Sequence, residues 1–227
     1  DGSELAVLNP GDPPDRQGNI AVVAAGTGLG EAILYWDGAV HQPIATEGGH
    51  TDFAPHTDRE YALLGFLRSK YGGHVSYERV LSGPGLHDMY RFLRSVSAAP
   101  EPGWLTMALE TEDSPAVIAR AGLADRDPVC AEALDLFTHI YGVEAGNLAL
   151  KCLAFGGLFL GGGIAPKILP ALKSSGFMRG FADKGRFAPW LRKIRVCVAL
   201  NPEASLIGAA HFACRLAWPC EGLECSG

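Results

Sequence analysis

The chain has 227 residues, of which 48% are hydrophobic and 19% are charged, and this balance excludes an intrinsically disordered protein. The length allows one or two domains with a sizeable core. The formal net charge of −6 argues against nucleic acid or an anionic membrane as the main partner.

Neither a membrane span nor a secretory leader is evident in the sequence. No apolar stretch reaches the ~18 residues that a transmembrane helix needs, and the acidic start is unlike a signal peptide. The six cysteines are scattered without a Cys-x-x-Cys pair, and four lie in apolar stretches, where free thiols behave as small hydrophobic groups. We therefore expect a cytoplasmic protein with neither a disulfide framework nor a zinc site.

The first part of the chain is expected to be rich in strands. Residues 1–18 contain many Gly, Pro and Asp residues, which predicts a loop or remnant linker before the first strand. Apolar runs predict strands at 20–25, 30–36 and 39–44. A short Gly/Thr turn separates the first two runs, and this arrangement is typical of a β-hairpin.

Helical patterns dominate the rest of the chain. Thr57 and Glu60 form a capping box, and the glycines at 72–73 end the helix that starts there. A long helix begins at Asp127-Pro128 and continues toward Cys152. The other predicted elements are an amphipathic helix at 86–96, short helical pieces at 100–122 and 174–193, a buried strand at 158–160, a helix from Pro166, a strand at 195–200, and a closing helix from Asn201 to Ala217. A hairpin-rich start followed by alternating helices and strands predicts a mixed α/β fold.

The turn in residues 24–30, AAGTGLG, is a candidate ligand site. Glycines at this spacing let a ligand lie against the backbone. Successive N–H groups in such a turn favour an anion, and the Thr27 hydroxyl adds a donor. The pattern alone is equally consistent with a phosphate-binding turn and with an ordinary Gly-rich hairpin.

Two acidic residues and a histidine are candidates for binding a polar ligand. Glu47 and His50 flank a Gly-Gly pair directly after a strand. A carboxylate accepts hydrogen bonds from hydroxyls and a neutral imidazole donates or accepts, which suits a polyol such as a sugar. Glu78 follows the expected helix cap Ser76. The alternatives are a structural histidine and a glutamate that places negative charge in a first helical turn.

The strand at 158–160 runs into Gly161-Gly162-Gly163 and then into a helix. Glycines at such a junction let a nucleotide approach the backbone at the start of a helix. A tight β-to-α turn without a ligand has the same composition.

Taken together and in order, four segments resemble bacterial glucokinases of the non-ROK type, in the actin/hexokinase/Hsp70 superfamily. They are residues 24–30, 46–50 (TEGGH), 75–86 (VSYERVLSGPGL) and 156–166 (GGLFLGGGIAP). The resemblance implies an α/β fold with a ribonuclease-H-like (actin/hexokinase-type) mixed sheet flanked by helices. It identifies residues 19–217 as the larger C-terminal lobe of a two-lobe kinase, followed by a tail at 218–227.

The resemblance also implies phosphorylation of glucose to glucose 6-phosphate with ATP and Mg²⁺. By the matching motifs, Glu47, His50 and Glu78 would contact glucose. The implied nucleotide-binding residues are Gly26, Thr27, Gly28, Gly162 and Gly163. The cysteine cluster of ROK-type kinases is missing after His50, so this histidine is assigned to sugar and no metal site is expected.

The family's catalytic base is an Asp in an Asn-Asp pair, and its first phosphate turn is of the Asp-x-Gly-Gly-Thr type. Neither pattern occurs in these 227 residues. We therefore expect that the N-terminal lobe is absent, that the chain holds no catalytic residue and that it is inactive alone. An apolar face left by that lobe predicts self-association, for example as a homodimer. The alternatives are a non-catalytic sugar- or nucleotide-binding module, half of a split kinase, and a kinase for another hexose or an N-acetylated sugar.

Overall fold

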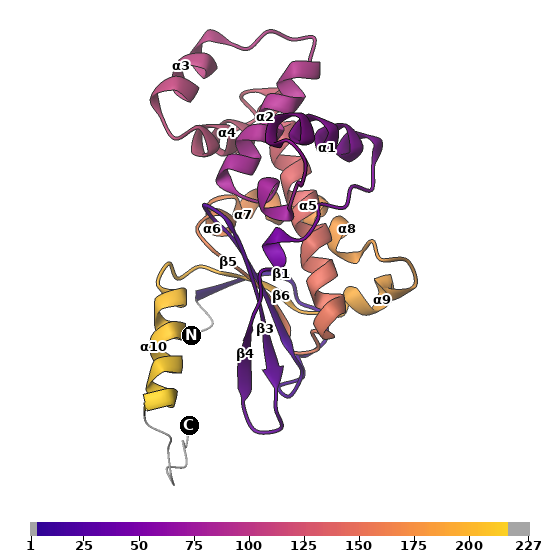
Figure 1. Ribbon diagram of the computed structural model, residues 1–227, viewed down its shortest axis with the longest axis vertical. Coiled ribbons are helices and arrows are strands. Elements are labelled where there is room, and N and C mark those ends of the chain that lie inside the picture. The colour runs from indigo at the N-terminus through magenta and orange to yellow at the C-terminus, as the bar shows by residue number, and fades with distance from the viewer. Residues whose placement is uncertain (1–3, 218–227) are drawn as a thin grey trace.

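A six-stranded mixed sheet forms the base of the computed structural model, which describes residues 4–217 (Figure 1). The strand order is β1-β6-β5-β2-β3-β4. β5 is parallel to both β2 and β6, and the other neighbouring pairs are antiparallel. The predicted mixed α/β sheet is therefore confirmed. The strands are β1 (Leu5–Asn9), β2 (Ile20–Ala25), β3 (Leu29–Trp36), β4 (His41–Ala45), β5 (Gly157–Gly161) and β6 (Val196–Ala199).

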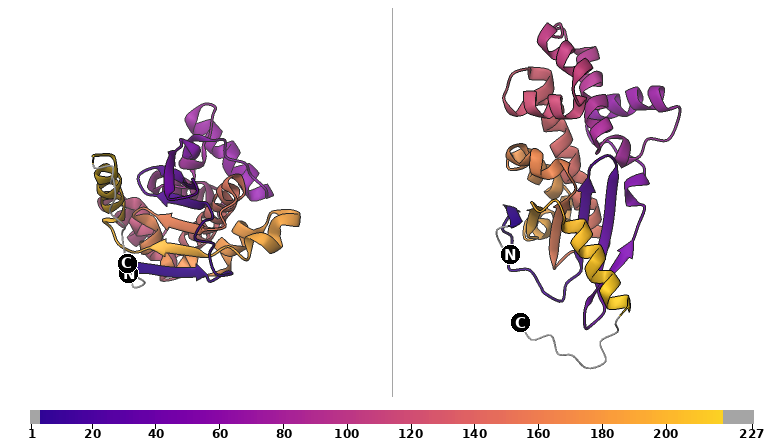
Figure 2. Two further views of the ribbon diagram at one scale, coloured as in Figure 1. Left: turned by 90° about the horizontal axis from the view of Figure 1, so that it is seen from below. Right: turned by 90° about the vertical axis from the view of Figure 1, so that its left-hand side faces the viewer.

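Helices α1 to α4 gather beyond one end of the sheet, at the top of Figure 1. α5 (Pro128–Cys152) runs from this group to the sheet and packs against β2 and α8. α10 (Ala204–Ala217) stands apart beside the sheet, as the left view of Figure 2 also shows. The remaining helices are α1 (Asp58–Tyr71), α2 (Gly83–Val96), α3 (Gly103–Thr111), α4 (Ser114–Leu123), α6 (Ile164–Lys167), α7 (Leu169–Leu172), α8 (Ser175–Ala182) and α9 (Ala188–Leu191), with 3-10 turns η2 (Gly48–His50), η3 (Tyr77–Arg79) and η4 (Gly185–Phe187).

The loop that composition predicts over residues 1–18 contains a strand, whereas residues 10–19 are irregular as expected. Leu5–Asn9 form the edge strand β1, which pairs antiparallel with β6. The Asn9 side chain also donates hydrogen bonds to the carbonyls of Arg192 (2.9 Å) and Ile194 (2.6 Å). An edge strand of about five residues leaves little sequence signal beside a Pro/Gly-rich segment.

The β2–β3 hairpin is present as predicted, and its turn is closed by the Gly26 N–H donating to the Gly28 carbonyl at 2.8 Å. β2 is parallel to β5, with Ala24 opposite Gly161. Parallel strands end at the same edge of a sheet. The glycine turn therefore lies next to residues 162–163, about 135 positions away in the sequence.

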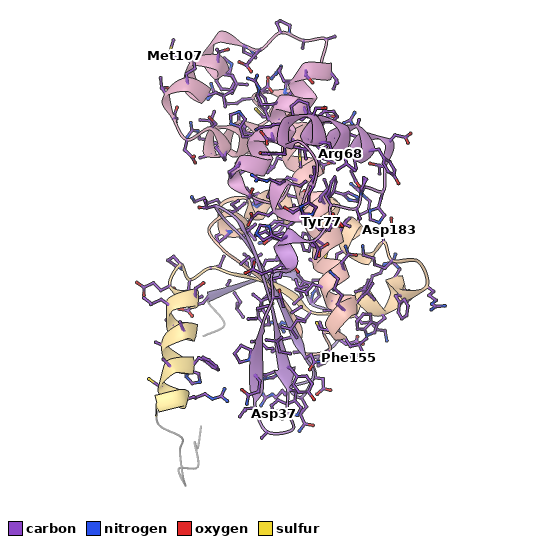
Figure 3. The ribbon with its side chains drawn as sticks, viewed as in Figure 1. Asp37, Arg68, Tyr77, Met107, Phe155 and Asp183 are labelled. Carbon is purple, nitrogen blue, oxygen red and sulfur yellow. The ribbon has the colours of Figure 1, made fainter. Side chains whose placement is uncertain are left out.

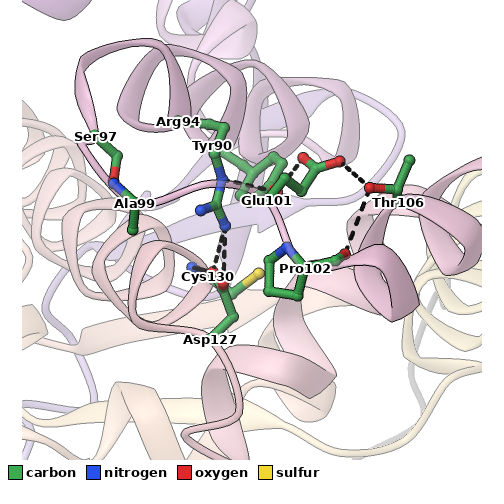
Figure 4. A network of polar contacts seen from close by, with 9 residues as sticks. All are labelled: Tyr90, Arg94, Ser97, Ala99, Glu101, Pro102, Thr106, Asp127 and Cys130. Carbon is green, nitrogen blue, oxygen red and sulfur yellow. Dashed lines mark hydrogen bonds and ion pairs between the residues drawn. The ribbon is translucent and has the colours of Figure 1, made fainter.

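The start of α5 is fixed by a buried network that joins three helices (Figure 4). The Asp127 carboxylate accepts hydrogen bonds from the Cys130 N–H at 2.9 Å and, through both oxygens, from Arg94 at 2.7 and 2.8 Å. Arg94 Nε donates to the Tyr90 hydroxyl, which donates to Glu101 at 2.6 Å. Burial opposes ionisation of Asp127, but the bonds from Arg94 and Cys130 outweigh it and lower its pKa.

Cys130, Cys152 and Cys197 are buried free thiols, as expected of small hydrophobic side chains, and Cys214 is a free thiol at the surface. Cys220, Cys225 and the predicted tail at 218–227 lie outside the described residues. Within residues 4–217, none of the helices combines the length and apolar character needed to cross a bilayer.

Candidate functional site

Glu78 lies between the glycine turn and His50. It is the middle residue of η3, a turn that Ser76 caps by accepting a hydrogen bond from the Arg79 N–H. Its Oε2 accepts a hydrogen bond from the Leu29 N–H at 3.0 Å, directly after the glycine turn. Its Oε1 lies 3.9 Å from His50 Nε2. One carboxylate therefore touches both segments that the sequence marked as separate candidates.

Gly28 is required by this arrangement. A Cβ on Gly28 would collide with the Glu78 carboxylate, whereas a Cβ on Gly26 would meet no atom within 4 Å. The two glycines thus have different roles. Gly28 makes room for Glu78, and Gly26 leaves the turn open to a ligand.

Glu47 and His50 belong to the same short turn. Glu47 precedes η2 as its N-cap residue, and its carbonyl accepts a hydrogen bond from the His50 N–H at 3.0 Å. The glycines between them press against β3, because a Cβ on Gly49 would collide with the Leu29 carbonyl. The Glu47 and His50 side chains are exposed. The turn therefore offers a carboxylate and an imidazole to a ligand from outside.

The two turns η2 and η3 are hydrogen-bonded neighbours. The Tyr77 N–H donates to the Thr51 carbonyl at 3.0 Å, and the Phe53 N–H donates to the Val75 carbonyl at 2.9 Å. Tyr77 lies between the helical group and the sheet in Figure 3. The structure therefore brings Glu47, His50 and Glu78 into one region.

A cavity of about 940 Å³ borders the glycine turn. Gly26, Thr27 and Gly163 line it, together with the start of α2, α4 and α6. Its apolar wall includes Leu86, Ala116, Ala119, Ile164 and Ile168. A volume in this range is typical of sites for small molecules and cofactors. Three of the five predicted nucleotide residues therefore border one cavity.

The other two predicted nucleotide-binding residues, Gly28 and Gly162, lie against other parts of the protein. Gly28 contacts Glu78, as described above. Gly162 has a φ of +76°, and a Cβ there would collide with the Ala25 carbonyl at the end of β2. Neither is among the residues that line the cavity.

Several residues of the cavity were not marked by the sequence as part of a site. Lys167 of α6 is an exposed cation at its edge, and His87 of α2 is half-buried. Burial lowers the pKa of His87, so it is neutral at neutral pH. Lys70 also lines the cavity and pairs with the buried Asp88. A signal for α2 was present, because the segment 82–85 (SGPG) opens that helix.

Within residues 4–217, no group of three or more His, Cys, Asp or Glu side chains is arranged to hold a metal ion.

A sequence model of the glucokinase family matches residues 2–216. The chain belongs to the glucokinase family. It is 43% identical over 215 residues to a glucokinase of Nostoc punctiforme, an alignment that covers 89% of this chain and 63% of the relative. A solved glucokinase from an Antarctic psychrotroph is 33% identical and superposes with a TM-score of 0.78, over 92% of this chain and 62% of that one.

More distant members of the same fold are also similar. A ROK family glucokinase from Streptomyces griseus, solved in complex with glucose and AMPPNP, has a TM-score of 0.58 at 20% identity, covering 87% of this chain and 61% of that one. These neighbours confirm the predicted sugar-kinase fold of the actin-like type. The chain spans only about 59% to 63% of the length of the curated relatives that it matches.

Proposed function

We propose that this chain is the sugar- and nucleotide-binding part of a glucokinase that transfers the γ-phosphoryl group of ATP to glucose. The observation that carries the proposal is the position of Glu78. It contacts the turn expected to hold phosphate and the histidine expected to hold sugar. Phosphoryl transfer needs the two substrates held side by side in a fixed orientation, because positioning supplies much of the rate enhancement.

On the sugar side, Glu78 and Glu47 would accept hydrogen bonds from glucose hydroxyls, and His50 would donate or accept one. Glu78 is already oriented by the Leu29 N–H at 3.0 Å, so one oxygen remains for a ligand. Its side chain is 30% exposed and that of His50 is 61% exposed. Both are therefore accessible to a hydroxyl-rich molecule, which supports the predicted roles.

On the nucleotide side, ATP fits the observed cavity. The apolar wall formed by α2, α4 and α6 suits an adenine ring, and Thr27 and Lys167 offer polar groups to phosphate. In the described part of the chain, the Thr27 N–H makes no hydrogen bond to another backbone group, so it is free to donate to an anion. Gly26 and Gly163 leave open space beside the backbone. Bound Mg²⁺ would neutralise charge on the phosphates.

The base that would accept the proton of the sugar hydroxyl is not assigned to any residue of this chain. The Asn-Asp pair and the Asp-x-Gly-Gly-Thr turn that the family uses do not occur in the sequence. We propose that an N-terminal lobe supplies both, in line with the greater length of the relatives. The second candidate function is a binding module without turnover. It too is based on the lack of these two motifs in the 227 residues. We also propose a cytoplasmic location, as expected of a glycolytic kinase.

Calorimetric titration of the 227-residue chain with glucose and with a non-hydrolysable ATP analogue tests the two sites separately. We expect Glu78→Ala and Gly28→Ala to weaken glucose binding at least about tenfold, since a charge-assisted hydrogen bond contributes about 1.5–3 kcal/mol. Gly26→Ala is the matched control, because a Cβ there meets nothing on the protein. It should leave glucose binding unchanged and weaken binding of the ATP analogue. Unchanged glucose affinity in Glu78→Ala would contradict the sugar assignment.

Complementation separates the kinase from the binding module. The chain alone is expected to show negligible glucose-dependent ADP release. Addition of a separately produced N-terminal lobe from a relative should restore turnover, because lobe closure excludes water and aligns the transfer. Binding of both ligands without any turnover after addition of the lobe would favour the module.

A further inference from the structure

A buried carboxyl pair lies beneath the two turns of the candidate sugar site. Glu31 on β3 is 7% exposed and Glu144 on α5 is fully buried. Burial and the neighbouring Glu144 carboxylate raise the pKa of Glu31 to about 7. The two side chains are within hydrogen-bonding contact. Two carboxyls form a hydrogen bond with each other only when one of them carries a proton.

Hydrogen-bond donors surround Glu144. Asn147 Nδ2 donates to Glu144 Oε2 at 2.7 Å, and Lys151 Nζ lies 3.5 Å from Oε1. The Lys184 ammonium, on the segment after α8, also faces Glu144. In contrast, Glu31 Oε1 is buried and makes no hydrogen bond within residues 4–217. The proton of the pair therefore belongs on Glu31, where it can be donated to Glu144.

Glu31 supports the turn that carries Glu47 and His50. A Cβ on Gly48 would collide with the Glu31 carboxylate, so the side chain lies directly against this turn. The Glu31 carbonyl accepts a hydrogen bond from Thr46 Oγ1 at 2.9 Å, and the same Oγ1 accepts one from the Gly48 N–H at 3.1 Å. Movement of Glu31 would therefore move the turn.

Glu144 supports the turn that carries Glu78. Asn147, which is bonded to Glu144, also donates to the Tyr77 hydroxyl at 3.2 Å. Burial and the Glu144 carboxylate raise the pKa of Tyr77, so its phenol stays protonated as a donor. Tyr77 is the residue before Glu78. Tyr141, on α5 near Glu31, is fully buried and bonded to β2, so it adds no charge to the pair.

We propose that Glu31 and Glu144 are positioning residues that share one proton and hold the two turns of the sugar site against α5. Loss of the proton leaves two buried negative charges side by side, which push Glu31 and the Gly48–His50 turn away from α5. The link to glucose rests on the function proposed above, whereas the effect on the turn does not. It follows that the turn loosens and sugar affinity falls as the pair ionises.

Glucose affinity as a function of pH tests the proposal. For the wild type we expect affinity to fall about three- to tenfold between about pH 6 and about pH 8, the interval in which a group with a pKa near 7 ionises. Glu31→Gln replaces the shared proton by a permanent amide donor. The variant should bind glucose at both pH values with the affinity that the wild type has near pH 6, so the fall in affinity between about pH 6 and about pH 8 should disappear. Equal pH profiles for the wild type and Glu31→Gln would overturn the proposal.

A reciprocal variant and a matched control complete the comparison. Glu144→Gln gives an amide that donates to ionised Glu31, so it should also flatten the profile. Glu110→Gln removes an exposed carboxylate of α3 and should retain the wild-type profile. A flattened profile in Glu110→Gln would show that the effect is not specific to the buried pair.

Hydrogen exchange separates failure of this proposal from failure of the proposed function. We expect protection factors of the amides at 48–51 in the ligand-free wild type to fall as pH rises through about 7, and to stay constant in Glu31→Gln. This result supports the positioning role even if glucose does not bind, in which case only the proposed function fails. Protection factors with the same pH dependence in both proteins would exclude the positioning role.

Discussion

α5 and α10 are both apolar helices that contain glycine, yet α5 is buried in the structure and α10 is exposed. Residues along most of the length of α5 are buried, and the helix packs against α2, α4, α8 and β2. α10 is exposed along nearly its whole described length, with Leu206 70% and Ile207 54% exposed. A hydrogen bond from Arg215 to the His41 carbonyl joins it to β4 at 3.3 Å.

The glycines show what this difference means. A Cβ on Gly142 of α5 would collide with the Phe177 carbonyl of α8, and one on Gly146 would collide with the Phe181 carbonyl. A Cβ on Gly208 of α10 would meet no atom within 4 Å. Glycine in α5 thus lets two helix backbones approach closely. In α10 it has no such role in the described structure, so apolar composition alone does not determine burial.

The largest effect is expected from Gly142→Ala. The new methyl group would occupy the position of the Phe177 backbone carbonyl. Rotation of a side chain cannot relieve this clash, so α5 and α8 must separate. We expect a loss of about 3 kcal/mol or more in the free energy of unfolding, measured by urea denaturation. A loss below that of an ordinary surface substitution would show that the helices are not in backbone contact.

Asp127→Ala should have the next largest effect. It removes the cap of α5 and leaves the mostly buried Arg94 without its partner, at a cost of about 2–4 kcal/mol. Because the folded-state pKa of Asp127 lies below its unfolded value, its contribution is present at neutral pH and is lost as pH falls through the folded pKa. The difference in unfolding free energy between Asp127→Ala and the wild type should therefore shrink in acid. A difference independent of pH would contradict this.

Gly208→Ala is the counterpart of Gly142→Ala on the exposed helix. The methyl group enters open space, and alanine has the higher helix propensity. We expect a gain in helix stability of about 0.5–1 kcal/mol, detectable as slower amide exchange in α10. A destabilisation would indicate that this face of α10 is packed against another molecule in solution.

The smallest effect on stability, within about 0.5 kcal/mol, is expected for Leu206→Ser combined with Ile207→Ser. Both side chains are mostly exposed. Their apolar surface is nevertheless expected to promote self-association, including the predicted homodimer. Light scattering at increasing concentration should show a lower apparent mass for the double variant than for the wild type. A wild type that stays monomeric throughout would remove the basis of this prediction.

Much of the fold could be predicted because its signals are local. Caps at Thr57, Ser76 and Asp127, the long apolar periodicity of α5 and the β2–β3 hairpin each involve residues that are near one another in sequence. The ordered glycine and Glu-x-x-His motifs carried the family resemblance, and the family match confirms it. The sequence also marked Glu78 as a candidate, although a first-turn glutamate had an ordinary explanation.

Only the tertiary structure decided which distant residues become neighbours. β1 was missed because a short edge strand is recognised by its partner β6, about 190 residues away. The contact of Glu78 with both Leu29 and His50, and the meeting of Glu31 with Glu144, depend on how β3, η3 and α5 pack. The exposure of α10 likewise depends on tertiary packing, because its apolar sequence alone predicts burial. Helix periods and caps are set by neighbouring residues, whereas burial, proton sharing and ligand geometry depend on contacts between segments that the sequence does not place together.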